Sequence, residues 1–434
     1  MRGGRELGSL LVVLGSVGAA LAAAAILQDP ADRPRSESRS GESLARFAVA
    51  AQPLVAQRVA EIRGLRFESV PPPRVISAGR FRLLTERDSS GRRPRRRLAA
   101  AEIEAKLLGL VDPGADLSSL AGDTADLAAA AYDPRRDRLY VIRDAVPAGR
   151  ALTEFVLAHE LTHALEDQRF GLEDPGADSD DPALAELALV EGTASVVMTE
   201  YARRHLDALE LAGAALGLDT STHGVPRFVV EQLGFAYLRG AVFVERLHAA
   251  AAGWNVVDIA LRERPPASTE QILHPRKYLL DERPLPIRAP PSPGAGWEPV
   301  DRGSAGEFAT GQLLRLGVSD AESRNASAGW GGDRYLLWRR RGAPLGCASQ
   351  ATCRAGFALA VRWRWDSAAD RREFARALGA YARDGLDGTS AGPGGWALPG
   401  GWAAIGGAGG AITLALAPSR ALAERLAGPG RFVR

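Results

Sequence analysis

Residues 154–168 read EFVLAHELTHALEDQ, and this stretch carries most of the information about fold and chemistry. His159 and His163 stand four residues apart in a strongly helical pattern. At about 100° per residue, the two imidazoles fall on one face, about 40° apart and one turn along. The apolar residues around them favour a helix buried in the core. The stretch therefore predicts a long helix over residues 150–170, with Glu160 beside the paired imidazoles.

This arrangement is typical of a zinc site. Two imidazoles one turn apart can hold one Zn²⁺ at about 2.0–2.1 Å each. The Glu160 carboxylate can reach a metal-bound water without being a ligand. The chain has only 6 His in 434 residues, so chance would give such a motif on the order of 0.005 times. The alternative is two histidines satisfied within a buried helix, but burying Glu160 without a charge partner is costly.

A third protein ligand is expected, because catalytic zinc keeps three protein ligands and one open position. Residues 188–195 read ALVEGTAS, and Glu191 is the acidic residue of this apolar stretch. The residues that follow it on the same face are small, which predicts a close approach to the helix that bears the histidines. Glu186, about 140° away around the helix, and Glu200, about two and a half turns further along, are weaker candidates. For Glu191 the alternative is a solvated glutamate.

The pattern HELTH, followed 28 residues after His163 by the glutamate of VEGTA, resembles the glutamate-zincin (gluzincin) metallopeptidases, of which thermolysin is the familiar member. It is most similar to uncharacterised bacterial metallopeptidases that are exported or membrane-anchored. The matching segments are HELTHALEDQRFGL, ALVEGTA, PPASTEQILHPRKY at 265–278 and GWGGDRY at 329–335. The resemblance implies Zn²⁺ held by His159, His163 and Glu191, with Glu160 as general base.

Two positions depart from related patterns. The three-histidine zincins need a further histidine six residues after His163, and Arg169 at that position excludes them. Thermolysin-like sites carry an aspartate four residues after the glutamate ligand, where it orients a histidine; here that position is Ser195. A hydroxyl could do this more weakly, or Asp167 or another group could replace it. The group that orients the histidines is therefore left open.

Peptide hydrolysis also needs a donor for the developing oxyanion besides the metal. His274 is the candidate, at the end of a short helix that a capping box at residues 268–271 opens. The alternative is an interaction of His274 with the C-terminus of its own helix. Tyr201 and Tyr278 are weaker candidates. The predicted catalytic residues are thus Glu160 and His274.

The implied function is a zinc-dependent peptidase that hydrolyses peptide bonds through a metal-activated water. Two alternatives stay open: a binding or envelope-maintenance protein that keeps the zincin fold without turnover, and a zinc amidase that acts on non-peptide cell-wall material. The intact Glu160 favours the enzyme. The expected partner is a peptide or protein substrate outside the cytoplasm.

The N-terminus predicts export. Arg2 and Arg5 precede an uncharged run over residues 7–27, which is long enough to cross a bilayer of about 30 Å. Because the positive flank comes first, the remainder of the chain is expected outside the cytoplasm. Residues 1–28 are therefore a signal-anchor, or alternatively a cleaved signal peptide, and residues 29–43 form a polar linker. The expected location is the cell membrane with an extracytoplasmic body, or secretion after cleavage.

Net charge and cysteine count limit the classes of binding partner and metal site. Net charge is +2 with 54 basic and 52 acidic residues, so no bulk attraction to nucleic acid is expected. The chain has 2 cysteines, which excludes a disulfide scaffold and any four-cysteine zinc site. Cys347 and Cys353 lie six residues apart and could close a small disulfide loop in an oxidising compartment.

The expected fold class is α+β. A mainly helical zincin-like domain with a small sheet is predicted over residues 44–290, and a smaller α+β domain with an antiparallel sheet over 295–434. Within the first, 44–130 could be a regulatory subregion with the arginine run at 92–97 as a cleavage point. The proline-rich segment 284–293 separates the two. Expected helices lie at 44–64, 98–110, 182–211, 228–252, 304–316, 367–384 and 418–427. A short strand and turn are expected over 74–84, a hairpin over 131–142, and strands near 334–339, 355–364, 401–405 and 411–416.

Overall fold

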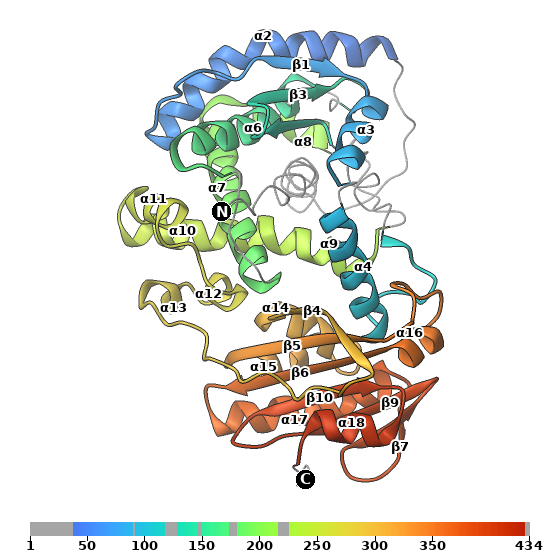
Figure 1. Cartoon of the computed structure of the whole chain (residues 1–434). Helices are drawn as coiled ribbons and strands as arrows, with labels where there is room; N and C mark the ends of the chain where they lie inside the picture. The colour runs from blue at the N-terminus through green and yellow to red at the C-terminus, as the bar shows by residue number, and fades with distance from the viewer. Residues whose placement is uncertain are drawn as a thin grey trace.

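The computed structural model describes residues 38–89, 92–117, 128–145, 149–172, 180–215 and 225–429. A mainly helical unit with a small sheet lies above a unit built on a large antiparallel sheet (Figure 1). The α+β class predicted from the sequence is confirmed. The segment predicted at 1–28, and residues 29–37 of the predicted linker, lie outside the described residues.

The small sheet has three strands in the order β1-β3-β2. β1 (Pro73–Ile76) runs parallel to β3 (Arg138–Ile142), and β2 (Ala130–Asp133) pairs antiparallel with β3. The hairpin expected within 131–142 is therefore confirmed. β2 lies at one edge of this sheet, next to the helix that carries the two histidines.

The strand and turn expected over 74–84 are correct only in their first part. The strand ends at Ile76, and α3 (Ala78–Ser89) follows directly. The Ser77 hydroxyl accepts a hydrogen bond from a backbone N–H in the first turn of this helix, and the Asp144 carboxylate accepts one from the N–H of residue 78. These two acceptors satisfy the free N–H groups of a helix start.

Further helices make up the rest of this unit. In chain order they are α2 (Ser38–Arg63), α6 (Arg150–Phe170), α7 (Asp180–His205), α8 (Ala208–Ala215), α9 (Arg227–Gly234), the π-helix η2 (Phe235–Arg239), α10 (Gly240–Ala250), α11 (Asn255–Arg262), α12 (Thr269–Leu273) and α13 (Pro275–Leu279). The bounds of α6 are those predicted. The helix expected over 182–211 instead breaks after His205, and the one expected over 228–252 contains a π-turn.

α7 is the one helix in the described part of the chain whose length and apolar composition would let it cross a membrane. Of the 18 most apolar consecutive residues of α7, 61% are buried inside the protein. Glu191 is one of the buried residues of this helix. Two aspartates start α7 and basic residues end it, as the helix dipole favours. We therefore describe α7 as a core helix.

The first helix of the predicted regulatory subregion belongs to the hydrophobic core. Val55 and Val59 of α2 are fully buried in a cluster with Leu161 and Leu165 of α6. At the end of α2, the buried Arg63 donates at 2.6 Å to Glu166 of α6 and at 2.6 Å to Asp258 of α11. Removing α2 would therefore expose one side of the helix that bears the histidines. Regulation by residues 44–130 stays a prediction.

The C-terminal unit is a seven-stranded sheet in the order β4-β5-β6-β10-β9-β8-β7, with antiparallel pairing throughout. Its strands are β4 (Trp297–Gly303), β5 (Trp330–Arg340), β6 (Phe357–Trp365), β7 (Thr389–Ser390), β8 (Gly395–Leu398), β9 (Gly401–Gly406) and β10 (Ile412–Ala417). Its helices are α14 (Gly306–Leu314), α15 (Asp320–Ser327), α16 (Gln350–Gly356), α17 (Ala368–Ala380), the π-helix η3 (Tyr381–Gly385) and α18 (Arg420–Ala427). Every element expected here is present, and β4, β7, β8, α15 and α16 were not anticipated.

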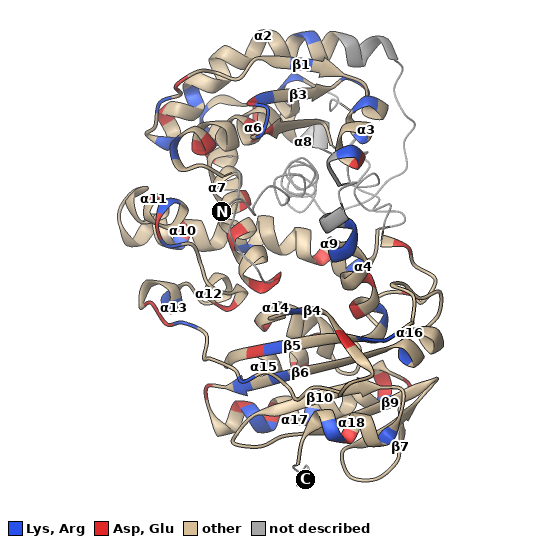
Figure 2. Cartoon of the chain, in the orientation of Figure 1, with Lys and Arg blue, Asp and Glu red and all other residues tan. Residues whose placement is uncertain are grey.

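Two segments of the chain join the units. α4 (Arg92–Leu107) belongs to the first half of the sequence, but its residues Ile103 and Leu107 are buried in the core of the C-terminal unit. Its basic first turns are exposed at residues 95–97, as expected of a solvated face (Figure 2). The proline-rich segment is extended along the large sheet, where the N–H of Leu285 donates to the carbonyl of Gly331 at 2.7 Å. A side chain at Gly331 or Gly332 would collide with Leu285, so the GWGG sequence provides the close approach.

Cys347 and Cys353 form the disulfide that their spacing predicts. The bridge ties the loop after β5 to α16, where Cys353 is fully buried. Basic and acidic residues occur along the ribbon of both units (Figure 2).

Candidate metal centre

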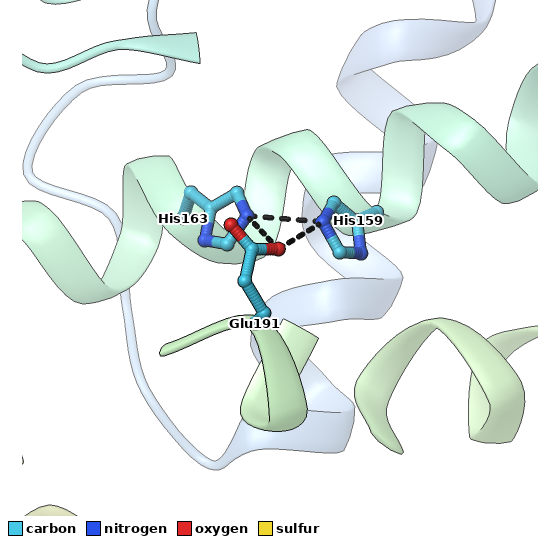
Figure 3. A group of neighbouring side chains, drawn as sticks. All are labelled: His159, His163 and Glu191. Atoms are coloured by element: carbon cyan, nitrogen blue, oxygen red, sulfur yellow. Dashed lines mark hydrogen bonds and ion pairs between the residues drawn. The ribbon is translucent and has the colours of Figure 1, made fainter. Parts of the chain in front are cut away.

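His159, His163 and Glu191 meet at the crossing of α6 and α7 (Figure 3). The Nε2 atoms of the two histidines are 3.0 Å apart. One oxygen of Glu191, Oε2, lies 3.1 Å from Nε2 of His159 and 3.5 Å from Nε2 of His163. All three residues are buried, with His159 and Glu191 at 0% exposure. The structure thus brings together the three predicted ligands.

The geometry of this cluster fits a metal ion. In a tetrahedral zinc site with ligand distances of about 2.0–2.1 Å, the ligand atoms lie about 3.3–3.4 Å from one another. The three observed separations of 3.0, 3.1 and 3.5 Å span that value. The other Glu191 oxygen, Oε1, is buried without a hydrogen-bond partner. Two imidazoles and a carboxylate are also a donor set that zinc accepts.

The electrostatics describe a site that demands positive charge. Although burial opposes it, the neighbouring His163 lowers the pKa of the Glu191 carboxyl to about 2. Burial alone would lower the pKa of His163, but the Glu191 carboxylate raises the pKa of that imidazole to about 9. Burial lowers the pKa of His159, which favours its neutral form. A divalent cation would supply the charge that the His163 proton otherwise provides.

Glu160 lies beside the ligands but is not one of them. Its Oε2 accepts a hydrogen bond of 2.8 Å from the backbone N–H of Tyr132 on β2, while its Oε1 is buried and has no partner. Burial raises the pKa of the Glu160 carboxyl to about 8. One oxygen is therefore held in place, and the other is available to accept a proton.

A small pocket opens onto this group. Its lining residues come from β2 and the following turn, α6 and α7: Tyr132, Pro134, Glu160, His163, Asp167, Leu172, Val190 and Glu191. Both the predicted base and two of the predicted ligands face the same space, so a molecule in the pocket would contact all three.

Neither candidate for orienting a histidine does so through a hydrogen bond. Asp167 accepts from the Tyr132 hydroxyl at 2.8 Å and from the N–H of Leu172 at 2.9 Å. The Ser195 hydroxyl and the His159 Nδ1 are both buried without a hydrogen-bond partner. Asp167 therefore fixes the position of Tyr132, whose N–H in turn holds Glu160.

His274 is placed elsewhere. It ends α12 and precedes α13, and its Nε2 lies 3.0 Å from both oxygens of Glu307 on α14. It is not among the residues that line the pocket. The Ser268 cap predicted for its helix is present. The structure thus brings His274 to the contact between the two units and not to the metal centre, so its role as oxyanion donor stays a prediction without support here.

The weaker candidates also have other partners. The Tyr201 hydroxyl donates to Glu154 and accepts from Arg58, and the Tyr278 hydroxyl donates to the carbonyl of Arg264. Glu200 pairs with two arginines on its own helix. Glu186 lies outside the ligand group.

α7 packs against α6 as expected, and Gly192, the first small residue after Glu191, also admits a third helix. A Cβ added at Gly192 would lie 2.2 Å from the backbone of Gly240, which starts α10. A Cβ at Gly240 would lie 2.0 Å from the carbonyl oxygen of Ala188. The backbones of α7 and α10 therefore touch beside Glu191.

Two residues near the centre were not anticipated. Tyr132 acts through its backbone N–H, a group that every residue other than proline carries, so no side-chain pattern marks it. Tyr237 of η2 is buried, and its ring stacks on that of His159 at a centroid distance of 5.7 Å. A buried aromatic in an apolar helix is ordinarily a core residue, so only the fold shows its neighbour.

Comparisons with known proteins add little to this description. Residues 297–426 match a family described as a domain of unknown function, DUF8575. No curated protein sequence matches the chain. One solved structure similar to this chain is that of a candidate hydrolase with a novel fold from Chloroflexus aurantiacus. The match has a TM-score of 0.35 and 18% identity, and it covers 62% of this chain and 97% of that one. A likeness this weak carries no argument about activity.

Proposed function

We propose that the chain is a zinc-dependent peptidase whose catalytic body lies outside the cytoplasm. The observation that carries the proposal is the cluster of His159, His163 and Glu191, with ligand atoms 3.0–3.5 Å apart, beside a fourth buried group, Glu160, that faces the same pocket. A merely structural zinc site is closed by four protein ligands, whereas a catalytic one has three and an open position. Three ligands beside a pocket support the catalytic kind.

The chain's own residues have distinct parts in the proposed reaction. A zinc ion bound here would acidify a water and polarise the scissile carbonyl. Glu160 accepts the water proton at Oε1, its free oxygen, and passes it to the leaving amine. The N–H of Tyr132 holds Oε2 and keeps the carboxylate turned toward the pocket. His274 is assigned no step.

The edge strand supports a peptide as the substrate. The N–H of Ile142 on β3 donates to the carbonyl of Ala129. Backbone groups alternate in direction along a strand, so those of Ala130 and Tyr132 point away from β3. In the described part of the chain no strand pairs with this edge. The Tyr132 N–H on this edge is already taken by Glu160, so an extended peptide would add there through the backbone groups of Ala130 and the carbonyl of Tyr132.

The location rests on two features. The Cys347–Cys353 disulfide is typical of an oxidising compartment. The predicted signal-anchor at residues 1–28 would hold the body at the outer face of the membrane. The proposed partner is therefore a peptide or protein substrate outside the cytoplasm.

Metal content of the full-length protein tests the proposal, with wild type measured beside Glu191→Ala and Glu160→Gln. We expect one zinc per chain in wild type and in Glu160→Gln, and loss of zinc from Glu191→Ala. A mixed peptide library should then be cleaved by wild type and left intact by both variants. A wild type without tightly bound metal would overturn the proposal. Bound zinc without cleavage of any peptide would favour the alternatives: a binding protein, or an amidase that acts on cell-wall material.

A further inference from the structure

The helix over residues 227–250 is interrupted by a π-turn beside the metal centre. The N–H of Gly240 donates to the carbonyl of Phe235, five residues earlier, instead of four. A π-turn inserts one extra residue into a helix, and such turns are frequent at functional sites. Here it lets three consecutive residues, 235–237, be buried together.

The two aromatic residues of this turn have different partners. The Phe235 ring packs on Phe308 of α14, in the C-terminal unit, at 4.3 Å between centroids. The Tyr237 ring lies on the ring of His159, with 26° between the planes. Two positions apart on a regular helix point about 200° apart. The two rings therefore reach different neighbours from one turn of helix.

His159 is unusual for a metal ligand because its second ring nitrogen has no hydrogen bond. A ligating histidine almost always donates its other N–H to a carboxylate, a carbonyl or water, and this bond sets the orientation of the ring. Nδ1 of His159 is buried without a partner, and the contacts with Glu191 and His163 are both made by Nε2. Ring packing remains to hold the imidazole plane. Tyr237 covers one side of it, and His163 meets it edge-on at 4.6 Å.

The stacked ring has a rigid support. Tyr237 lies three residues before Gly240, whose backbone touches that of Gly192 next to the Glu191 ligand. The position of Tyr237 is therefore fixed relative to α7 by a backbone contact that no side-chain motion can relax. The ring and the carboxylate ligand share one anchor.

We propose that Tyr237 is a positioning residue for the metal centre: by stacking it holds the His159 ring in the plane in which Nε2 faces the metal, in place of a hydrogen bond at Nδ1. This inference rests on the metal centre of the proposed function. It assigns the ring, and not the hydroxyl, as the part of Tyr237 that matters.

Metal titrations of the full-length apo-protein test the assignment. Zn²⁺ affinity is measured by competition with a chelator, and Co²⁺ is used as a spectroscopic probe because its visible absorption reports ligand geometry. Tyr237→Leu and Tyr237→Met remove the ring, and Tyr237→Phe keeps it. Tyr278→Leu is the matched control, because Tyr278 is equally buried and also packs on an aromatic ring, that of Phe243 on α10. Thermal unfolding of each apo-protein reports the purely structural cost.

We expect Tyr237→Leu and Tyr237→Met to weaken Zn²⁺ binding about 10- to 100-fold and to change the Co²⁺ spectrum. Tyr237→Phe should restore both, and Tyr278→Leu should lower the melting temperature while leaving both unchanged. If either variant without the ring kept the wild-type Zn²⁺ affinity and Co²⁺ spectrum, the role of Tyr237 would be overturned and the proposed function would stand. An equal loss in Tyr278→Leu would also overturn the role of Tyr237, since the effect would then be general destabilisation. Failure of wild type to bind either metal would instead overturn the proposed function, and this inference with it.

Discussion

The metal centre and strand β5 of the large sheet both contain buried carboxylates, but these carboxylates differ in how many hydrogen bonds they accept. Asp333 on β5 accepts four hydrogen bonds, from the hydroxyl of Ser304, the N–H groups of Ala305 and Gly306, and the indole of Trp330. At the metal centre, Glu160 and Glu191 each keep one buried oxygen without a partner. Buried polar groups in folded proteins are nearly always paired. The unpaired oxygens of Glu160 and Glu191 are therefore available to a partner in the pocket that both residues line.

This difference separates a carboxylate that stabilises the fold from carboxylates that belong to the candidate site. The carboxylate of Asp333 organises the loop that leads into α14, so its loss should cost stability. Burial raises the pKa of the Glu160 carboxyl, so its charge makes the apo-protein less favourable to fold. The lowered pKa of Glu191 means that its pairing with His163 stabilises the fold despite burial. Loss of Glu160 should therefore cost activity with little or no cost to the fold, and loss of Glu191 should cost metal and some stability of the apo-protein. Four substitutions test this contrast.

The largest effect is expected from Glu160→Gln. A general base contributes about 10²–10⁴-fold to rate, and the amide cannot accept the proton. We expect turnover of a peptide substrate to fall by that factor while zinc content is unchanged. The melting temperature of the apo-protein should stay the same or rise, because the amide carries no charge to bury. Retained turnover in Glu160→Gln would remove this residue from the mechanism.

The next largest effect is expected from Gly192→Ala. The added methyl would lie 2.2 Å from the Gly240 backbone, and neither helix has a flexible group to move aside. We expect destabilisation of about 3 kcal/mol or more, measured by denaturant unfolding, together with weakened zinc binding. Gly234→Ala is the control, because a Cβ there meets nothing within 4 Å. It should stabilise the protein by up to about 1 kcal/mol. Similar results for both glycines would show that helix propensity, and not the contact, explains them.

The parts of the candidate site that could be predicted are those formed by residues close together in the sequence. The four-residue spacing of His159 and His163 lies on one strongly periodic helix, and the observed bounds of α6 are those predicted. Glu191 was identifiable because a single carboxylate in an apolar helix is costly to bury unless it has a charged partner or a metal. The disulfide followed from two cysteines separated by a short turn.

The remainder depends on contacts between distant segments, which leave no periodic signal. The Tyr132 N–H reaches Glu160 from a strand 28 residues away, and Tyr237 stacks on His159 from another helix. Gly331 and Gly332 admit the segment at Leu285 along a strand, a contact that lies outside the local sequence pattern. Asp333 is bonded to a loop about thirty residues earlier, where one hydroxyl and two backbone N–H groups converge on it.

A moderate effect is expected from Asp333→Asn. The amide nitrogen would face donors that now bond to a carboxylate oxygen, and at least one N–H or O–H would lose its partner. We expect destabilisation of about 2–3 kcal/mol, measured by denaturant unfolding, with no change in zinc affinity. A loss of zinc binding that exceeds the loss of stability would show that the loop at 304–306 is coupled to the metal centre, and the contrast between the two units would fail.

The smallest effect is expected from His274→Gln, and it decides whether His274 belongs to the site or to the contact between units. The Glu307 hydrogen bond raises the pKa of the imidazole above its usual 6.5, with Glu270 adding to this and both burial and Lys277 opposing it. A raised folded-state pKa means that the pair contributes its full stability below about pH 6.5, and that this is lost as the pH rises through the folded-state value.

Because 42% of the His274 side chain is exposed, solvent screens the pair, and its contribution should stay below about 1 kcal/mol. Wild type should therefore be slightly more stable than His274→Gln in mildly acidic buffer and equal to it in alkaline buffer, as measured by thermal unfolding across the pH range. Peptide turnover should change by less than about threefold, since Glu307 and not the pocket engages the imidazole. A large fall in turnover without the pH-dependent difference in stability would return His274 to the role of oxyanion donor. It would also require the two units to move together during catalysis, because in this structure the imidazole faces Glu307.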